Sequence, residues 1–156
     1  MGIISGWSFF CFWIGLWVSP QPDFRLHAIH PVKILIIGEV PILHVLLSLF
    51  FLFPALYFGL GGLAELGLKV SETHRPKKVI TRGIYSRVRH PQYLGGLFGH
   101  ISMTLLLSGL YSLYVTPIVI AEVYLIAQKE EKELIKEFGA DYKRYQEKVP
   151  MFIIRK

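Results

Sequence analysis

The sequence predicts an all-α integral membrane protein, a bundle of about four transmembrane helices followed by a helical, cytosolic C-terminal tail. The first observation is composition: 53% of the 156 residues are apolar and mean hydropathy is +0.45, well above a typical soluble domain. The second is that the apolar residues form long blocks, at 1–18, 34–63 and 94–128. About 20 such residues cross a hydrocarbon core near 30 Å, and the third block is long enough for two short helices.

The first two helices are bounded by prolines. The first is predicted over Ile3–Val18 and ends at Ser19–Pro22, whose two prolines prevent continuation. A cleaved signal peptide is the alternative, but the block lacks a basic leading region and a small-residue cleavage motif. The second helix is predicted over Val32–Leu63, with bends at Pro41 and Pro54.

Two ionisable residues interrupt the apolar sequence of the second helix. Intramembrane ionisable residues are functional candidates by default. Glu39 is close enough to the predicted helix start to reach the interface. His44 lies deeper, and we expect a neutral imidazole hydrogen-bonded to another helix.

The second half of the chain predicts two further spans and a tail. Pro91 suits the first position of the third helix, and a break is expected near Ser108–Leu110. The fourth helix is predicted over Leu113–Gln128 and continues as an amphipathic segment to Phe138. Gly139 ends it, and a short helix over Ala140–Lys148 is expected to fold back on the bundle or lie along the membrane surface.

Gly95 and Gly99 form a G-x-x-x-G pair in the third helix. Glycines at this spacing remove side chains from one helix face and let another backbone approach closely. We therefore expect this face to pack against a neighbouring helix.

The net charge of +6 is unevenly distributed along the chain. Two of the 17 Lys and Arg residues precede the second apolar block, seven lie within 68–91 and eight follow Gln128, whereas 108–114 has none. The positive-inside rule then places the 64–92 connection, the tail and the N-terminus in the cytosol. Anionic lipid headgroups are the expected partner of these charges, and no fold signal indicates nucleic-acid binding.

Neither a disulfide nor a metal site is predicted. Cys11 is the single cysteine, so it has no intramolecular partner. His27 and His30 have a spacing that metal ligands use, but no third ligand is nearby.

Two segments carry the candidate chemistry. One contains the Arg-His-Pro-Gln-Tyr run within Gly83–Tyr93, and the other begins with Glu130 and Glu131 and continues to Val149-Pro150. Together they resemble the membrane methyltransferases of the isoprenylcysteine carboxyl methyltransferase and phospholipid methyltransferase group, over roughly 77–152 of a single domain, 1–156.

The resemblance implies S-adenosylmethionine as cofactor. The chain has no G-x-G-x-x-G motif after a strand, so a Rossmann site is excluded. Aromatic faces would instead stack adenine or attract the sulfonium, carboxylates would bind the ribose or ammonium group, and a helix N-terminus would take the carboxylate. The cofactor-binding residues expected by motif are Lys77, Lys78, Val79, Ile80, Tyr85, His90, Pro91, Gln92, Tyr93, Glu130 and Glu131. Arg89 and the Glu pair have interfacial anchoring as the alternative, and for Tyr142 and Tyr145 we favour packing of the tail.

The acceptor is expected to be a lipid-like or hydrophobic small molecule with a carboxylate, amine or thiol. We predict that it enters sideways from the bilayer, through an opening near the cytosolic leaflet lined by Leu97, His100 and Tyr124. Prenylcysteine enzymes carry, in the resemblance, an Arg one turn before the Glu pair, where this chain has Ile126. A membrane reductase of the sterol-reductase type and a non-enzymatic membrane accessory protein are the alternatives.

Overall fold

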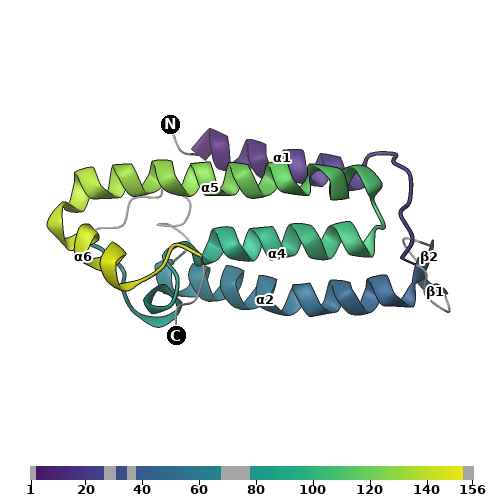
Figure 1. Cartoon of the computed structure of the whole chain (residues 1–156), viewed down its shortest axis with the longest axis horizontal. Coiled ribbons are helices and arrows are strands. Elements are labelled where there is room, and N and C mark those ends of the chain that lie inside the picture. The colour runs from purple at the N-terminus through teal and green to yellow at the C-terminus, as the bar shows by residue number, and fades with distance from the viewer. Residues whose placement is uncertain (1–2, 27–30, 35–37, 68–77, 153–156) are drawn as a thin grey trace.

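The structure, a computed structural model, describes residues 3–26, 31–34, 38–67 and 78–152. These residues form five α-helices, one 3₁₀ helix and a two-stranded antiparallel sheet (Figure 1). The elements are α1 (Ile3–Val18), β1 (Pro31–Ile34), β2 (Gly38–Pro41), α2 (Ile42–Leu66), η1 (Gly83–Ser86), α4 (Pro91–Leu106), α5 (Leu110–Phe138) and α6 (Ala140–Lys148). Lys77, His27 and His30 lie outside the described residues.

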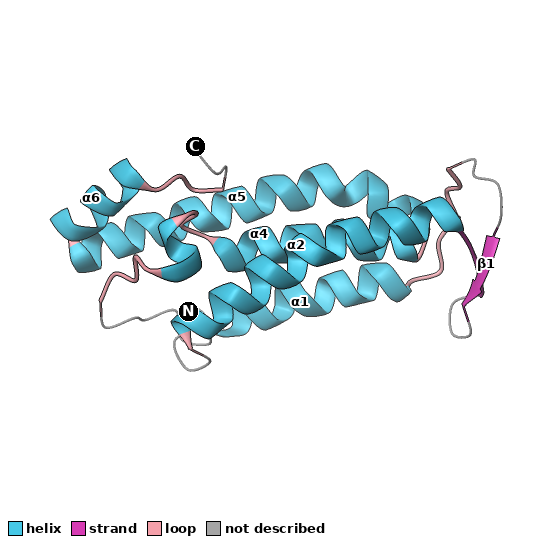
Figure 2. Ribbon diagram, turned by 90° about the horizontal axis from the view of Figure 1, so that it is seen from below, coloured by secondary structure: helices cyan, strands magenta, loops and turns pink. Residues whose placement is uncertain are grey.

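The four longer helices run along the same axis, with α4 packed against both α2 and α5. The hairpin of β1 and β2 lies at one end of this bundle, and η1 and α6 lie at the other (Figure 2). Since α4 begins and α2 and α5 finish at the α6 end, residues 78–90 and the tail meet there.

Among the described residues, two helices, α2 and α5, are long and apolar enough to cross a membrane. The 16 residues of α1 and of α4 extend only about 24 Å each, short of a hydrocarbon core of about 30 Å. The four predicted spans are therefore not confirmed. The 29 residues of α5 extend about 43 Å, so its charged last turns, with Glu130 and Glu131, project beyond such a core.

The all-α prediction is wrong between residues 31 and 41, where a β-hairpin replaces the predicted start of the second helix. Pro31 pairs with Pro41 and Lys33 with Glu39 across the two strands. Pro41 lacks an N–H and its ring would clash with the preceding turn of a helix, and Gly38 has a φ of +84°, outside helical geometry. The helix begins only after Pro41.

The break between the last two long helices is confirmed, although α5 begins three residues before the predicted Leu113. Ser108 turns the chain with a φ of +52°. The connection after α1 then pairs with this turn, since Phe24 N–H donates to Ser108 O (2.9 Å) and Leu110 N–H donates to Pro22 O (3.0 Å).

His44 has the structural role that the sequence predicted. It is fully buried, and its Nε2 accepts from Leu26 N–H at 3.0 Å. Its Nδ1 therefore carries the proton, and it lies 3.1 Å from Leu105 O and 2.9 Å from Ser108 Oγ, at the end of α4. The imidazole ties α2 to the α4–α5 turn.

The predicted glycine contact in the third helix is confirmed between α4 and α2. A Cβ atom on Gly95 would lie 2.4 Å from Gly59 N and 2.9 Å from Ala55 O. These are backbone atoms of α2, so they have little freedom to move away. The absence of a side chain at Gly95 is what lets the two helices approach.

Gly95→Ala is expected to destabilise the bundle. Overpacking of this kind costs about 1–3 kcal/mol, which thermal unfolding in detergent detects. Gly59→Ala is the matched control, because a Cβ on Gly59 meets no atom within 4 Å and the change favours the helix by up to about 1 kcal/mol. Equal melting temperatures for the two variants would show that the helices separate easily at this contact.

Candidate functional site

A pocket opens at the α6 end of the bundle, between the end of α2, the segment before η1, the start of α4, the last turns of α5, and α6. It encloses about 640 Å³, including its open mouth. Its walls combine aromatic rings, aliphatic side chains and a few charged groups. The lining residues are Leu66, Val79, Ile80, Tyr85, Arg89, His90, Gln92, Tyr93, Glu130, Leu134, Phe138, Tyr142 and Tyr145.

Most of the residues that the sequence singled out as cofactor-binding meet in this pocket. Those that line it are Val79, Ile80, Tyr85, His90, Gln92, Tyr93 and Glu130. Three described candidates do not line it: Lys78 is exposed, whereas Pro91 and Glu131 are buried.

The pocket is also lined by two tyrosines for which the sequence favoured packing of the tail. Tyr142 and Tyr145 project from α6 into it, and they are also the core of the tail cluster with Val149. Their three-residue spacing places both side chains on one face of α6, and this spacing was the sequence signal that could have indicated their place in the pocket. Arg89 is also a lining residue, and its place beside His90 in the Arg-His-Pro run could have indicated it.

The Arg-His-Pro turn is held by the end of the chain. Pro91 is the first residue of α4, so His90 is its N-cap, with φ −121° and ψ 63°. Arg89 N–H donates to Pro150 O (3.0 Å) and His90 N–H donates to Met151 O (3.3 Å). The tail beyond α6 thus satisfies two backbone donors that precede the helix.

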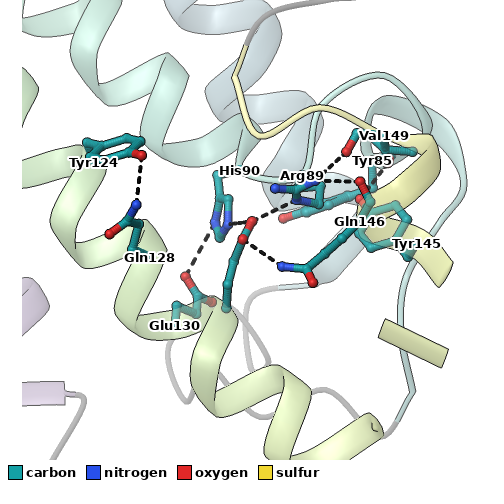
Figure 3. A network of polar contacts seen from close by, with 10 residues as sticks. Tyr85, Arg89, His90, Tyr124, Gln128, Glu130, Tyr145, Gln146 and Val149 are labelled. Atoms are coloured by element: carbon teal, nitrogen blue, oxygen red, sulfur yellow. Dashed lines mark hydrogen bonds and ion pairs between the residues drawn. The ribbon is translucent and has the colours of Figure 1, made fainter. Parts of the chain in front are cut away.

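Glu131 connects the turn to the tail through its side chain. Figure 3 labels three of its partners, Arg89, His90 and Gln146. Its Oε1 accepts from Arg89 Nε at 2.7 Å and lies 3.1 Å from His90 Nε2. Its Oε2 accepts from Gln146 Nε2 at 2.7 Å. Only 9% of the Glu131 side chain and 10% of the Arg89 side chain are exposed, so this ion pair is largely removed from water and depends on its hydrogen bonds.

Arg89 has further partners in the tail. Its Nη1 donates to Gln146 O (2.9 Å) and to Val149 O (2.5 Å). In the same region Tyr145 Oη donates to Tyr85 O at 2.6 Å. The guanidinium and the phenol together fix the end of α6 over η1 and the Arg-His-Pro turn.

His90 lies between two carboxylates. Its Nδ1 is 3.5 Å from Glu130 Oε2, and its Nε2 faces Glu131. Burial alone would lower the pKa of His90, but hydrogen bonds to Glu130 and Glu131 and their negative charge outweigh it and raise the pKa. The imidazole ring also stacks on Tyr93, with centroids 5.4 Å apart and planes 9° apart.

The tyrosines around the pocket remain protonated at neutral pH. Burial raises the pKa values of Tyr85, Tyr142 and Tyr145, and the nearby acidic groups raise them further. The pocket therefore presents neutral aromatic rings and hydroxyl donors beside the Glu130 carboxylate, a combination suited to a ligand that carries positive charge.

The three residues predicted to line the acceptor opening do not line the pocket. Leu97 packs against Trp13, Val119 and Val123 from α1 and α5. His100 is fully buried; its Nδ1 accepts from Trp17 Nε1 at 3.2 Å. The opening expected there is filled by the indole rings of α1.

Tyr124 differs from Leu97 and His100 in its exposure, with 47% of its surface exposed. Its hydroxyl accepts from Gln128 Nε2 at 2.7 Å, and these two side chains lie apart from Arg89 (Figure 3).

The sequence profile of the phospholipid methyltransferase family matches residues 62–141, just over half of the chain. The chain belongs to the phospholipid methyltransferase family. The matched region runs from the last turns of α2 through α4 and α5 to the start of α6. It therefore includes every described residue that lines the pocket except Tyr142 and Tyr145.

Curated proteins with similar sequences are named as methyltransferases. The chain is 31% identical over 83 residues to protein-S-isoprenylcysteine O-methyltransferase of Schizosaccharomyces pombe, which covers 51% of this chain and 34% of that protein. It is 38% identical over 74 residues to methanethiol S-methyltransferase 2 of Bradyrhizobium diazoefficiens (46% and 27%). It is 32% identical over 100 residues to methanethiol S-methyltransferase of Crocosphaera subtropica (62% and 38%). The chain thus spans about a third of the length of these relatives.

Proposed function

We propose that this protein is an integral membrane methyltransferase that uses S-adenosylmethionine and methylates a lipid-like or hydrophobic small acceptor. The observation that carries the proposal is the pocket at the α6 end, where the family's matched region brings Tyr85, His90, Tyr93 and Glu130 together. Methyltransferase names of the relatives support the reaction class.

The residues present fit the cofactor. Its cationic and aromatic parts need π-faces and a carboxylate, which Tyr85, Tyr93 and Glu130 provide within one pocket. Leu134 and Phe138 add apolar surface for an aromatic ring. Held by Tyr85, Tyr93 and Glu130, the bound cofactor would supply an electrophilic methyl group on a sulfonium for transfer to an acceptor oxygen, nitrogen or sulfur.

The chain's own contribution is positioning and exclusion of water. Arg89 is committed to Glu131 and to two tail carbonyls, so it shapes the wall of the pocket. Glu130 is the carboxylate that lines the pocket, and it would accept hydrogen bonds from ligand hydroxyl or ammonium groups. Positioning and desolvation supply most of the acceleration in a displacement of this type.

The acceptor is proposed to be a carboxylate, amine or thiol. The relatives are named for an isoprenylcysteine O-acceptor and for methanethiol, so acceptors of different size and nucleophile occur among similar proteins. In this chain Ile126 stands where the resemblance places an Arg in prenylcysteine enzymes, and it lies half-buried on α5. The position offers no charged partner to a substrate carboxylate, which favours a neutral acceptor.

The pocket is proposed to face the cytosol. It lies at the end where residues 78–90, which include four Lys and Arg residues, meet the basic tail, and positive charge favours the cytosolic side. Labelling, from outside intact cells, of a cysteine placed at Lys143 would contradict this orientation.

The test is isothermal titration of the detergent-purified protein with S-adenosylhomocysteine and, separately, with NADPH. We expect saturable binding of S-adenosylhomocysteine alone, because the pocket pairs a carboxylate with aromatic rings. Binding of NADPH alone would indicate a membrane reductase. Binding of neither would indicate a non-enzymatic accessory protein and overturn the proposal.

A further inference from the structure

Trp13 of α1 lies against a glycine of α4. Its side chain is 6% exposed, and a Cβ atom on Gly96 would be 3.4 Å from Cζ3 and 3.5 Å from Cη2 of the indole. The neighbours Phe12 and Ile14 are 54% and 40% exposed. The indole is therefore directed inward at the place where α4 has no side chain.

The cluster around Trp13 shares a wall with the pocket. Trp13, Val119 and Val123 are its buried members, and Tyr93 and Phe152 pack against them. Tyr93 also lines the pocket, and the Phe152 ring lies 5.9 Å from the His90 ring. These two rings connect the cluster to the polar groups of the pocket.

Tyr93 is a pocket residue that also packs against the Trp13 cluster, so it separates the pocket from α1. The aliphatic lining residues Leu66, Val79 and Ile80 lie in other walls, at the end of α2 and before η1. An apolar acceptor that left the bilayer between α1, α4 and α5 would meet the hydrophobic side chains of the Trp13 cluster before it reached Tyr93. Trp13 stands on that route.

We propose that Trp13 is a specificity-determining residue: its indole, behind Tyr93, closes the α1 side of the pocket and restricts the enzyme to acceptors with a short apolar part. The inference rests on the proposed function and specifies its substrate class. A flat ring seated on a glycine occupies the volume that a longer alkyl chain needs, and close-packed interiors leave no spare room for both. Removing the ring would admit longer chains.

Methyl transfer to a series of alkanethiols tests the restriction. Wild-type protein is expected to turn over methanethiol and to discriminate against octanethiol. In Trp13→Ala the ratio of octanethiol to methanethiol turnover is expected to rise at least about tenfold, since single methylenes in an apolar pocket change selectivity by 10–200-fold. Trp13→Phe should be intermediate. The matched control is Phe12→Ala, an exposed aromatic one residue away, which should leave the ratio unchanged.

Cysteine labelling tests the closure without any activity. Leu97→Cys, in a Cys11→Ser background, lies in the Trp13 cluster and should react slowly with N-phenylmaleimide in detergent. Addition of Trp13→Phe or Trp13→Ala should accelerate labelling about tenfold, as expected when a covering side chain is lost and local opening is easier. An unchanged labelling rate in both variants, or an unchanged turnover ratio, overturns the role of Trp13.

The two proposals fail in different ways. Loss of the proposed function appears as absence of S-adenosylhomocysteine binding and of methyl transfer by wild-type protein. The labelling experiment still decides whether Trp13 closes this side of the pocket. If the wild-type protein methylates octanethiol as readily as methanethiol, the proposed methyltransferase function holds, but the proposed restriction to short apolar acceptors is refuted.

Discussion

Glu131→Ala is expected to release the tail from the bundle and to cause the largest loss of stability of any substitution at the site. The variant leaves the buried Arg89 guanidinium without its carboxylate and removes the acceptor of Gln146. Breaking a buried pair by removing one partner costs about 3–5 kcal/mol. The measurements are thermal unfolding in detergent and limited proteolysis of the segment after α5.

The matched control is Asp141→Ala, which removes the Asp141–Arg144 ion pair on α6. Both side chains are largely exposed, 69% and 71%, so the loss should not exceed about 1 kcal/mol. The Glu131→Ala protein could instead have the same melting temperature as the control and keep a protease-resistant tail. That result would mean that the backbone hydrogen bonds from Arg89 and His90 to Pro150 and Met151 are sufficient to hold the tail.

Glu130→Gln is expected to weaken S-adenosylhomocysteine binding while the protein stays folded. Glu130 lines the pocket and its side chain is 24% exposed, so the amide keeps its shape and its access to water. Loss of the charge removes a polar contact worth about 1–3 kcal/mol, or roughly 5- to 150-fold in dissociation constant, read by isothermal titration.

Glu133→Gln controls for the loss of one negative charge from α5, because Glu133 is exposed and does not line the pocket. Its affinity should equal that of the wild type. Unchanged affinity in Glu130→Gln would show that the cofactor does not contact this carboxylate. A melting temperature that falls with the affinity would instead assign Glu130 a structural role through His90.

His90→Ala is a less selective probe of the same site. The sequence placed His90 among the cofactor contacts, and its ring does line the pocket. The ring also bridges Glu130 and Glu131 and stacks on Tyr93. Its removal would change binding and tail docking together, so the Glu130 and Glu131 variants separate the two effects better.

The sequence by itself determined the long helices and the residues around which the pocket is built. Apolar blocks and Gly139 located α5 and its end, because helix length and a positive φ at a helix stop are local properties. The Arg-His-Pro run predicted the start of α4 for the same reason. Pro41 was a local signal for a helix start just after it. The apolar residues before Pro41 instead led to a helix being predicted where the hairpin lies.

Only the tertiary structure decided which side chains share the pocket and which fill space elsewhere. The α6 tyrosines reach the pocket because the tail folds back, held by Arg89 and Glu131 across 42 residues of sequence. Leu97 and His100 match the pocket residues in helical spacing, yet Trp13 and Trp17 from α1 cover them. Spacing within one helix defines a face, whereas the partner of that face depends on contacts between distant segments.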